Sequence, residues 1–252
     1  MKNNSVLMCI LVSVVLLSSL ISTASEADEF VVGVENIEYF PIYARRDGAY
    51  AGYARALLDT FAIKESHTFT YKVLPIKRLL KSFLDGNVDL KFPDSPYWKK
   101  DLKAGKSVEY SEPVLEYIDG VLVAPSALGR GKGNLKDLGV LRGFTPWDYL
   151  DDIAAKSVIL KEVNSLNSLV KMAKAGRIDG VYFNVIVAKY FLENTMFDKN
   201  GLVFDSELPH TRGHYYMSTI KHPKLIASFN KFMAENKNLV ESIKAKYEVK
   251  LY

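Results

Sequence analysis

Residues 69–92 read FTYKVLPIKRLLKSFLDGNVDLKF. Residues 69–74 have the β-branched and aromatic composition of a strand, and Pro75 stands in a first helical turn, where proline is well tolerated. The apolar residues that follow recur at helical spacing: Leu79, Leu80, Phe83 and Leu84. Gly86 ends that pattern, and residues 88–92 return to a strand composition. This order of strand, helix and strand predicts two parallel strands joined by a crossover helix.

The same alternation extends in both directions along the chain. Further strands are predicted at residues 30–34, 120–125, 139–141, 157–163, 179–183 and 215–218. Further helices are predicted at residues 53–61, 166–175, 185–193, 223–235 and 238–247. Ser165 is positioned to cap the second of these helices, and Gly176 to stop it. Strands that alternate with helices, without a solenoid repeat, indicate an α/β protein with mostly parallel sheets.

The first 27 residues have the pattern of a secretory signal peptide. Lys2 supplies an early positive charge, residues 6–21 form a nearly continuous apolar run, and the small residues at 22–25 offer a cleavage site. An uncleaved anchor is the alternative, but serines interrupt the run, which falls short of the ~20 residues that usually span a bilayer. We therefore expect residues 1–27 to be removed and the protein to be periplasmic. Cys9, the only cysteine, lies in this segment, so we expect no disulfide.

The remaining chain of about 225 residues is long enough for one large domain or for two small lobes with cores of their own. Hydrophobic residues make up 48% of the sequence, as in globular proteins. The formal net charge is +4 and is spread without long runs of one sign. This balance gives no reason to expect nucleic acid or a membrane surface as a partner.

The motifs of several common enzyme classes are missing from the sequence. It contains no G-x-S-x-G, no phosphate-binding loop and no G-x-G-x-x-G between a strand and a helix. His210 and His214 form one pair at i, i+4, but no carboxylate motif accompanies them. We therefore expect no catalytic residue, no metal and no cofactor.

Nine short motifs follow one another in a characteristic order: VVGV (31–34), YFP (39–41), DG (47–48), GY (52–53), GNVD (86–89), YSEP (110–113), LKDL (135–138), GRIDG (176–180) and KY (246–247). Each motif alone is common. In this order, the chain resembles the periplasmic solute-binding proteins of the polar amino-acid ABC-transporter type (family 3), which have the type II periplasmic-binding-protein fold. The resemblance covers essentially the whole chain after the signal segment.

The resemblance implies a two-lobed α/β protein, with each lobe a mostly parallel sheet flanked by helices and two crossover strands between the lobes. The first lobe is then made of residues 28–120 and a return segment at 214–252, and the second lobe of residues 121–213. The ligand is expected in the cleft between the lobes, beyond the carboxyl ends of the strands. The protein is expected to be a monomer.

Two departures from the family pattern concern the ligand. In the family, an arginine after the strand at 88–92 grips the ligand carboxylate through two parallel hydrogen bonds. Here Asp94 falls on a polar ligand contact and Asp101, in an ungapped alignment, on the arginine itself. The family's acid that receives the ligand ammonium is replaced by Asn184. We therefore expect weak binding of neutral α-amino acids and, because an acid faces the cleft, a preference for a cation or a hydroxyl donor.

The resemblance also indicates further ligand contacts. Tyr39 falls on the family's stacking position, and Trp98 offers a second aromatic platform. Arg142 is a candidate for contact with an anion. It precedes Phe144 and Thr145, in a turn that presents backbone N–H groups and a threonine hydroxyl at a helix start in the family.

Arg78 resembles the P-x-x-R element of one branch of the family, and Ser95 stands where the family has a serine or threonine run. A purely structural role stays open for the candidates. Arg78 suits a solvated helix face, Asp94 suits a turn cap between two prolines, and Asn184 suits a strand end. The aromatic candidates suit packing.

These features together predict a non-enzymatic, extracytoplasmic solute-binding protein. It would capture a small polar ligand and deliver it to an ABC permease in the inner membrane. One alternative is a ligand-sensing subunit for a membrane receptor, which would use the same cleft. A second alternative is a dehydratase-like enzyme on the same fold, in which cleft carboxylates such as Asp94 act as acid and base.

Overall fold

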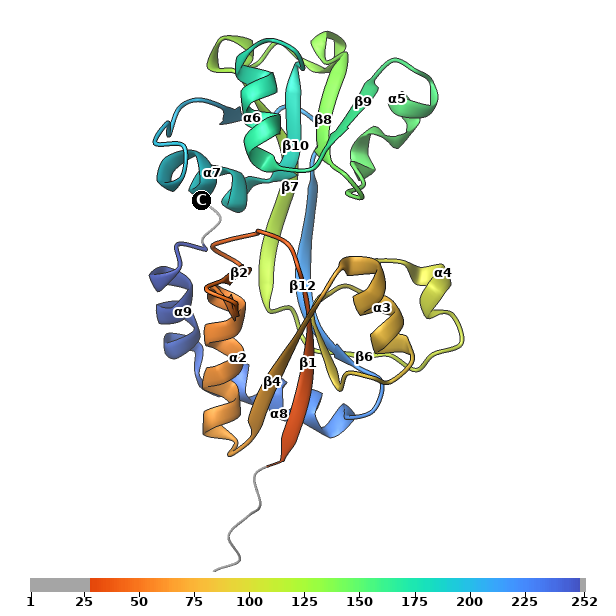
Figure 1. The fold of residues 1–252 in the computed structure, drawn as a ribbon, viewed down its shortest axis with the longest axis vertical. Helices are drawn as coiled ribbons and strands as arrows, with labels where there is room; N and C mark the ends of the chain where they lie inside the picture. Colours follow the sequence, from red (N-terminus) through yellow and green to blue (C-terminus); the bar gives the residue numbers. More distant parts are fainter. Residues whose placement is uncertain (1–27, 250–252) are drawn as a thin grey trace, which may run out of the picture.

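The computed structural model describes residues 28–249, so the predicted signal peptide at 1–27 lies outside the described residues. The chain forms two lobes stacked along the long axis of the molecule and joined by two long strands, β7 (Leu115–Val123) and β12 (Thr211–Thr219) (Figure 1). We call the lobe that contains the first strand lobe 1 and the other one lobe 2. The predicted two-lobed α/β architecture is confirmed.

Lobe 1 is a twisted sheet with helices on both faces. Its own strands are β1 (Glu29–Glu35), β2 (Ala44–Arg46), β3 (Ala49–Ala51), β4 (Thr68–Leu74), β5 (Leu90–Asp94) and β6 (Glu109–Tyr110). Its helices are α2 (Tyr53–Lys64), α3 (Ile76–Leu84), α4 (Lys100–Lys103), α8 (Pro223–Glu235) and α9 (Lys237–Lys246). The sheet order is β4, β1, β5 and β12, in which β1 is parallel to both of its neighbours.

Lobe 2 repeats this plan with a second sheet. Its strands are β8 (Asp137–Leu141), β9 (Ile159–Val163), β10 (Gly180–Asn184) and β11 (Val203–Phe204). Its helices are α5 (Leu150–Ala154), α6 (Leu166–Lys174) and α7 (Val185–Asn194), with 3₁₀ turns at η1 (Pro125–Ala127), η2 (Lys132–Asn134) and η3 (Trp147–Tyr149). β8 is parallel to β9 and β10, and β7 closes the parallel part as an antiparallel neighbour of β10.

β12 belongs to both sheets. Residues 211–215 pair with β7, and the strand then pairs with β5 and β6 up to Thr219. The partner changes after Tyr215, and the register with β5 then shifts between Tyr216 and Ser218. The two lobes are therefore joined by hydrogen-bonded strands rather than by a loose linker.

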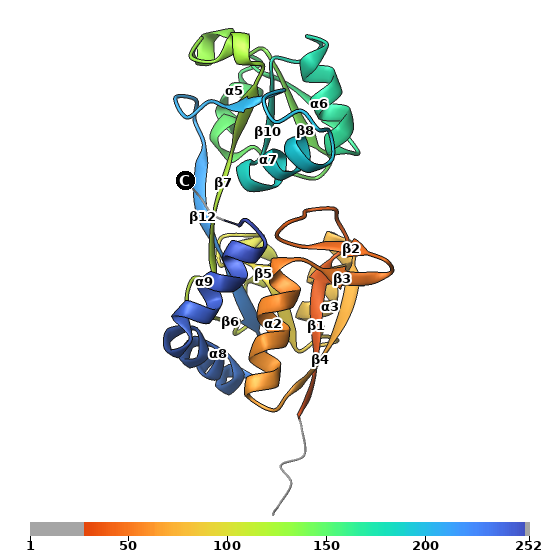
Figure 2. The same ribbon diagram turned by 90° about the vertical axis from the view of Figure 1, so that its left-hand side faces the viewer.

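The helices of the return segment complete the core of lobe 1. α8 and α9 lie beside α2 on one side of the lobe in both views (Figures 1 and 2). Phe61 of α2 makes an edge contact with Phe229 of α8 at 5.0 Å between ring centroids, and Phe232 lies 5.4 Å away. All three side chains are buried. Aromatic contacts of this kind fix the return segment against the first half of the chain.

Several predicted elements are present, although β5 spans 90–94 rather than the predicted 88–92. The strand, helix and strand of residues 69–92 form β4, α3 and β5, with β1 inserted between the two strands. α8 spans the predicted residues 223–235. Ser165 caps α6, since its side chain accepts a hydrogen bond from the backbone N–H of Ser168 at 3.2 Å.

The two crossover strands are longer than predicted. β7 begins at Leu115 rather than at Gly120, and β12 spans 211–219 rather than 215–218. The prediction began at Gly120 and so left out Asp119, but both residues lie inside β7. A Cβ atom at Gly120 would meet the ring of Phe204 at 2.5 Å, so the glycine serves close packing against β11 and not a turn.

The start of α2 fixes a loop that carries aromatic side chains toward the interlobe region. The helix has no side-chain cap, and its backbone N–H groups at Tyr53 and Ala54 donate to the carbonyls of Pro41 and Ile42, each at 2.9 Å. Gly52 lies at φ +106°, and a Cβ atom there would meet the same two carbonyl oxygens at 2.8 and 2.9 Å. Only glycine fits this close approach.

We expect Gly52→Ala to lower the free energy of unfolding by about 1–3 kcal/mol, because the substitution forces a left-handed backbone and a clash with two carbonyls. Urea unfolding followed by circular dichroism measures this loss. Gly133→Ala is the matched control, since a Cβ atom there meets nothing within 4 Å. Equal stability of the two variants would contradict the account of the helix start.

Candidate functional site

A cavity of about 150 Å³ lies between the lobes. The last residues of β1, β5 and β10 line it, namely Glu35, Asp94 and Asn184. The crossover strands add Asp119 and Tyr215. The cavity thus lies at the carboxyl ends of the parallel strands, where open α/β sheets bind ligands. Lobe 1 supplies most of its charged side chains, and lobe 2 supplies mostly aromatic ones.

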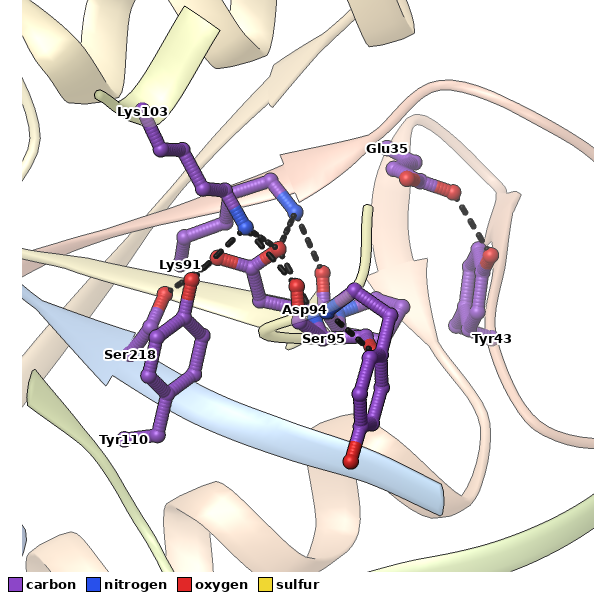
Figure 3. A network of polar contacts seen from close by, with 10 residues as sticks. Glu35, Tyr43, Lys91, Asp94, Ser95, Lys103, Tyr110 and Ser218 are labelled. Carbon is purple, nitrogen blue, oxygen red and sulfur yellow. Dashed lines mark hydrogen bonds and ion pairs between the residues drawn. The ribbon is translucent and has the colours of Figure 1, made fainter. Parts of the chain in front are cut away.

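The lobe 1 wall is organised around the carboxylate of Asp94 (Figure 3). Its Oδ1 accepts hydrogen bonds from Lys91 Nζ at 3.0 Å, Lys103 Nζ at 2.9 Å and the backbone N–H of Ser95 at 2.8 Å. Its Oδ2 accepts from the hydroxyl of Ser218 at 2.7 Å. Asp94 is only 1% exposed. Burial alone raises the pKa of Asp94, but the two lysines outweigh it and hold that pKa below its ordinary value.

The two lysines are themselves buried and well satisfied. Lys91 Nζ also donates to the carbonyl of Pro93 at 2.7 Å. Lys103 Nζ donates to the carbonyl of Ser95 and to the hydroxyl of Tyr110, both at 2.8 Å, so its three N–H bonds all have acceptors. Burial lowers the pKa of Lys103, although Asp94 acts in the opposite direction. Both ammonium groups are therefore directed at the protein.

Glu35 lies beside this network at the end of β1. Its Oε2 accepts a hydrogen bond from the hydroxyl of Tyr43 at 2.7 Å (Figure 3). Burial raises the pKa of Glu35, while the charge of Lys91 and the hydrogen bond from Tyr43 reduce that rise. Sequence reasoning missed Glu35, Lys91 and Lys103. The signal for Glu35 was its position directly after the buried run 31–34, at a strand end.

The structure corrects one expectation about Asp94. An uncompensated acid was expected on the lobe 1 wall, but Asp94 is neutralised by Lys91 and Lys103. Its charge therefore gives no reason for lobe 1 to attract a cation. Contact between Asp94 and a ligand stays a prediction.

On the lobe 2 side, Asn184 has a structural role and also lines the cavity. Its Oδ1 accepts a hydrogen bond from the backbone N–H of Val187 at 3.1 Å and so caps α7. Its Nδ2 donates to the hydroxyl of Tyr215 at 3.3 Å. The open alternative of a strand-end cap is thus realised for Asn184, which is fully buried.

Asp119 is the acid that sequence reasoning missed on this side. It lies on β7 directly opposite Asn184 of β10. Its Oδ1 is shielded from solvent and has no hydrogen-bond partner among residues 28–249. Burial raises the pKa of Asp119 to about 7, the amide of Asn184 opposes the rise, and the charge of Asp148 adds to it. Asp119 was missed because the predicted strand began at Gly120, whereas residues 115–119 are held in β7 by pairing with β12.

Aromatic rings from both lobes meet at the cavity. Tyr39 of lobe 1 lies 5.4 Å from Phe183 and 6.0 Å from Phe144 of lobe 2, measured between ring centroids. Phe144 and Phe183 stack at 5.6 Å with an interplanar angle of 5°. Trp98 makes an edge contact with Tyr215 at 5.9 Å. Tyr39, Trp98 and Phe144 were singled out from the sequence, whereas Phe183 was not.

The remaining sequence candidates are divided. Thr145 lines the cavity together with Phe144, in the turn before η3. Ser95 is buried beside Asp94, and its hydroxyl accepts a hydrogen bond from the backbone N–H of Tyr97 at 3.3 Å. Arg78 and Arg142 are exposed and do not line the cavity. Ligand binding by any of these residues stays a prediction.

Residues 28–249 contain no group of three or more histidine, cysteine, aspartate or glutamate side chains that could hold a metal ion. His210 instead makes an edge contact with Phe204 at 5.4 Å. The geometry of the cavity is that of a binding site lined by buried acids, lysines and aromatic rings.

We expect Asp94→Asn to lower the free energy of unfolding at pH 7 by about 3–5 kcal/mol, because two buried lysines lose the charge that compensates them. Ser218→Ala is the matched variant. It removes one hydrogen bond to the same carboxylate and should lower stability by about 1 kcal/mol. Urea unfolding measures both losses. A similar small loss in both variants would contradict the central role of the carboxylate.

A second expectation concerns the pH dependence of stability. The pKa of Asp119 is about 7 in the folded protein against 3.8 as its ordinary value, so the folded state binds this proton more tightly. The resulting stabilisation is complete below about pH 4 and is lost as the pH rises through about 7. Asp119→Asn should therefore flatten the fall in unfolding free energy between pH 4 and pH 8 by a few kcal/mol, at about 1.4 kcal/mol per pKa unit.

Urea unfolding at pH 4, 6 and 8 tests this expectation. Asp101→Asn on the exposed side of α4 is the control for the loss of one carboxylate. Parallel pH profiles for Asp119→Asn and the unsubstituted protein would show that Asp119 is not the group responsible.

Comparisons with known proteins give a fold. No family model matches the sequence, and no curated protein matches it. The sensor domain of a histidine kinase with similarity to periplasmic binding proteins aligns with a TM-score of 0.70 at 17% identity, over 88% of this chain and 96% of that one. The histidine-bound substrate-binding protein of an ABC uptake transporter from Streptococcus pneumoniae aligns with a TM-score of 0.67 at 18% identity, over 87% and 92% of the two chains.

An ancestral amino-acid-binding protein, described as a precursor of cyclohexadienyl dehydratase, aligns with a TM-score of 0.68 at 17% identity, over 88% of this chain and 95% of that one. Within residues 28–249, no helix has the length and apolar character needed to cross a membrane. These alignments extend over nearly the whole of each structure and include both lobes. The chain therefore has the two-lobed type II periplasmic-binding-protein fold.

Proposed function

We propose that this protein is an extracytoplasmic solute-binding protein that captures a small polar solute between its lobes and delivers it to an ABC permease. The observation that carries the proposal is the cavity between the lobes. Its walls come from both lobes and from β7 and β12, which join them. A ligand in this position touches both lobes at once, which is the requirement for ligand-driven closure.

Closure is a population shift between open and closed arrangements of the two lobes. Only a ligand that binds the closed arrangement more tightly shifts the population. The lobes already touch inside and outside the cavity: Tyr39 meets Phe183 in the cavity wall, and Phe40 meets Tyr190 beside it, at 4.9 Å between ring centroids. Residues 28–120 with 214–252, and residues 121–213, are the units that we propose to move as rigid bodies.

The similar solved structures support binding rather than catalysis, because most of them are described as binding proteins. The histidine kinase sensor domain supports the receptor alternative, and the dehydratase precursor keeps the enzyme alternative testable. Two acids with raised pKa values, Glu35 and Asp119, line the same cavity, as acid–base chemistry would need. Solute binding without turnover requires none of this chemistry and is the simpler use of the site.

A thermal-shift screen of the purified protein tests the proposal. The screen covers amino acids, amines, organic acids and small sugars. A solute that binds only the folded state stabilises it by about 2.7 kcal/mol at 100 times its Kd, so a binder should raise the melting temperature clearly. Incubation of each hit with the protein, followed by mass spectrometry, separates binding from turnover. A screen without a single shift would count against solute binding.

For the solute found, we expect Tyr39→Ala to weaken binding by about 1–3 kcal/mol, because the ring forms part of the wall shared by both lobes. Isothermal titration calorimetry measures the change. Phe197→Ala is the control, since Phe197 is 87% exposed in lobe 2 and does not line the cavity. Unchanged affinity in Tyr39→Ala would show that the cavity is not the binding site. Capture of membrane proteins by the solute-loaded protein then distinguishes a permease from a receptor.

A further inference from the structure

The buried acid on the crossover strand is the feature of the cavity that still needs a partner. Asp119 lies between Asn184 of β10 and Thr211 of β12, its register neighbours on either side. Asn184 uses its side chain for α7 and Tyr215, and the hydroxyl of Thr211 donates to Asp148 at 2.6 Å. Among the described residues that line the cavity, Asp119 alone has a shielded side-chain oxygen without a hydrogen-bond partner. A buried polar atom of this kind needs a ligand or solvent partner.

The lysines of the cavity do not compensate this acid. Lys103 has all three N–H bonds engaged, and Lys91 donates to Pro93 and Asp94. Lys99, the third lysine of the cavity, is exposed and forms no ion pair with Asp119. The groups that act on the carboxyl of Asp119 are the amide of Asn184 and the negative charge of Asp148. Asp94 on lobe 1 thus has two cationic partners, whereas Asp119 at the crossover forms no ion pair with a described residue.

Aromatic rings surround the position where a ligand would meet this acid. Tyr39, Tyr182 and Tyr215 lie close enough for the charge of Asp119 to raise their pKa values. The stacked rings of Phe144 and Phe183 complete this side of the cavity. Aromatic faces attract cations and shield them from water, whereas they offer nothing to an anion. A carboxylate beside aromatic faces is the chemistry that recognises an organic ammonium group.

We propose that Asp119 receives the ammonium group of the ligand, and that the cleft selects a small organic amine over an alcohol or a carboxylate of the same shape; this rests on the solute-binding function proposed above. The amine enters as its cation, so its charge meets the acid that lacks a partner. Asp94 is already paired with Lys91 and Lys103, so Asp94 is not available to the ammonium group. A cavity of about 150 Å³ is the size that holds a benzene-sized solute.

The test uses matched probes that differ only in the polar group: benzylamine, benzyl alcohol and benzoate, with n-butylamine, 1-butanol and butyrate as a second set. Calorimetry at pH 8 measures their affinities for the protein, for Asp119→Asn and for Asp101→Asn. The first variant replaces the acid by a neutral group of the same shape. The second removes one carboxylate from the exposed side of α4 and serves as the control, because Asp101 does not line the cavity.

We expect at least one amine to bind at least tenfold more tightly than its alcohol and its carboxylate. Asp119→Asn should abolish that preference, with a loss of at least tenfold in amine affinity, while Asp101→Asn keeps it. Unfolding curves of both variants establish that they are folded. Equal or tighter binding of the carboxylates, or an amine preference that survives in Asp119→Asn, overturns the inference.

The same probes separate failure of this inference from failure of the proposed function. If the broad solute screen yields a ligand but neither amine binds, solute binding stands and the inference about amines is wrong. If the screen yields no ligand of any class, the solute-binding function fails and the inference fails with it.

Discussion

The architecture depends on one strand that is hydrogen bonded to both sheets. The nine residues of β12 pair with β7 at one end and with β5 and β6 at the other. The same strand supplies Ser218 to the carboxylate of Asp94 and Tyr215 to the cavity and to the side chain of Asn184. Because backbone pairing and cavity contacts share this strand, the spacing of the lobes and the shape of the site are set together.

Local patterns predicted the elements whose cause is local. The helix at 76–84 follows from an apolar stripe and a glycine stop, and the cap at Ser165 follows from its side chain. The true start of β7 could not be read in the same way, because residues 115–119 are held by pairing with β12, which lies far away in sequence. Asp119 lies in this segment, so the sequence did not indicate it as a cavity residue.

The charged residues of the site also depend on contacts between distant parts of the chain, which local patterns do not predict. Lysine is almost never buried without a partner, so Lys91 between Leu90 and Phe92 reads as an exposed position of a strand. Its burial becomes understandable only when the chain folds Lys103 and Ser218 around the carboxylate of Asp94. The sequence identified Asp94 as unusual, but it did not show which cations compensate the charge of Asp94. A buried ion pair of this kind adds little net stability, whereas removal of one partner is costly.

The aromatic contact between Phe61 of α2 and Phe229 and Phe232 of α8 has a consequence for how the chain reaches this structure. Residues of lobe 2 are contiguous, whereas lobe 1 joins segments separated by the whole of lobe 2. Because lobe 2 precedes α8 in the chain, lobe 2 is able to collapse before α8 is available to cover α2. Such non-local pairing slows folding and leaves an apolar face open to aggregation or to chaperones in the meantime. The nested order of the chain therefore predicts that lobe 1 becomes native only once the return segment is available.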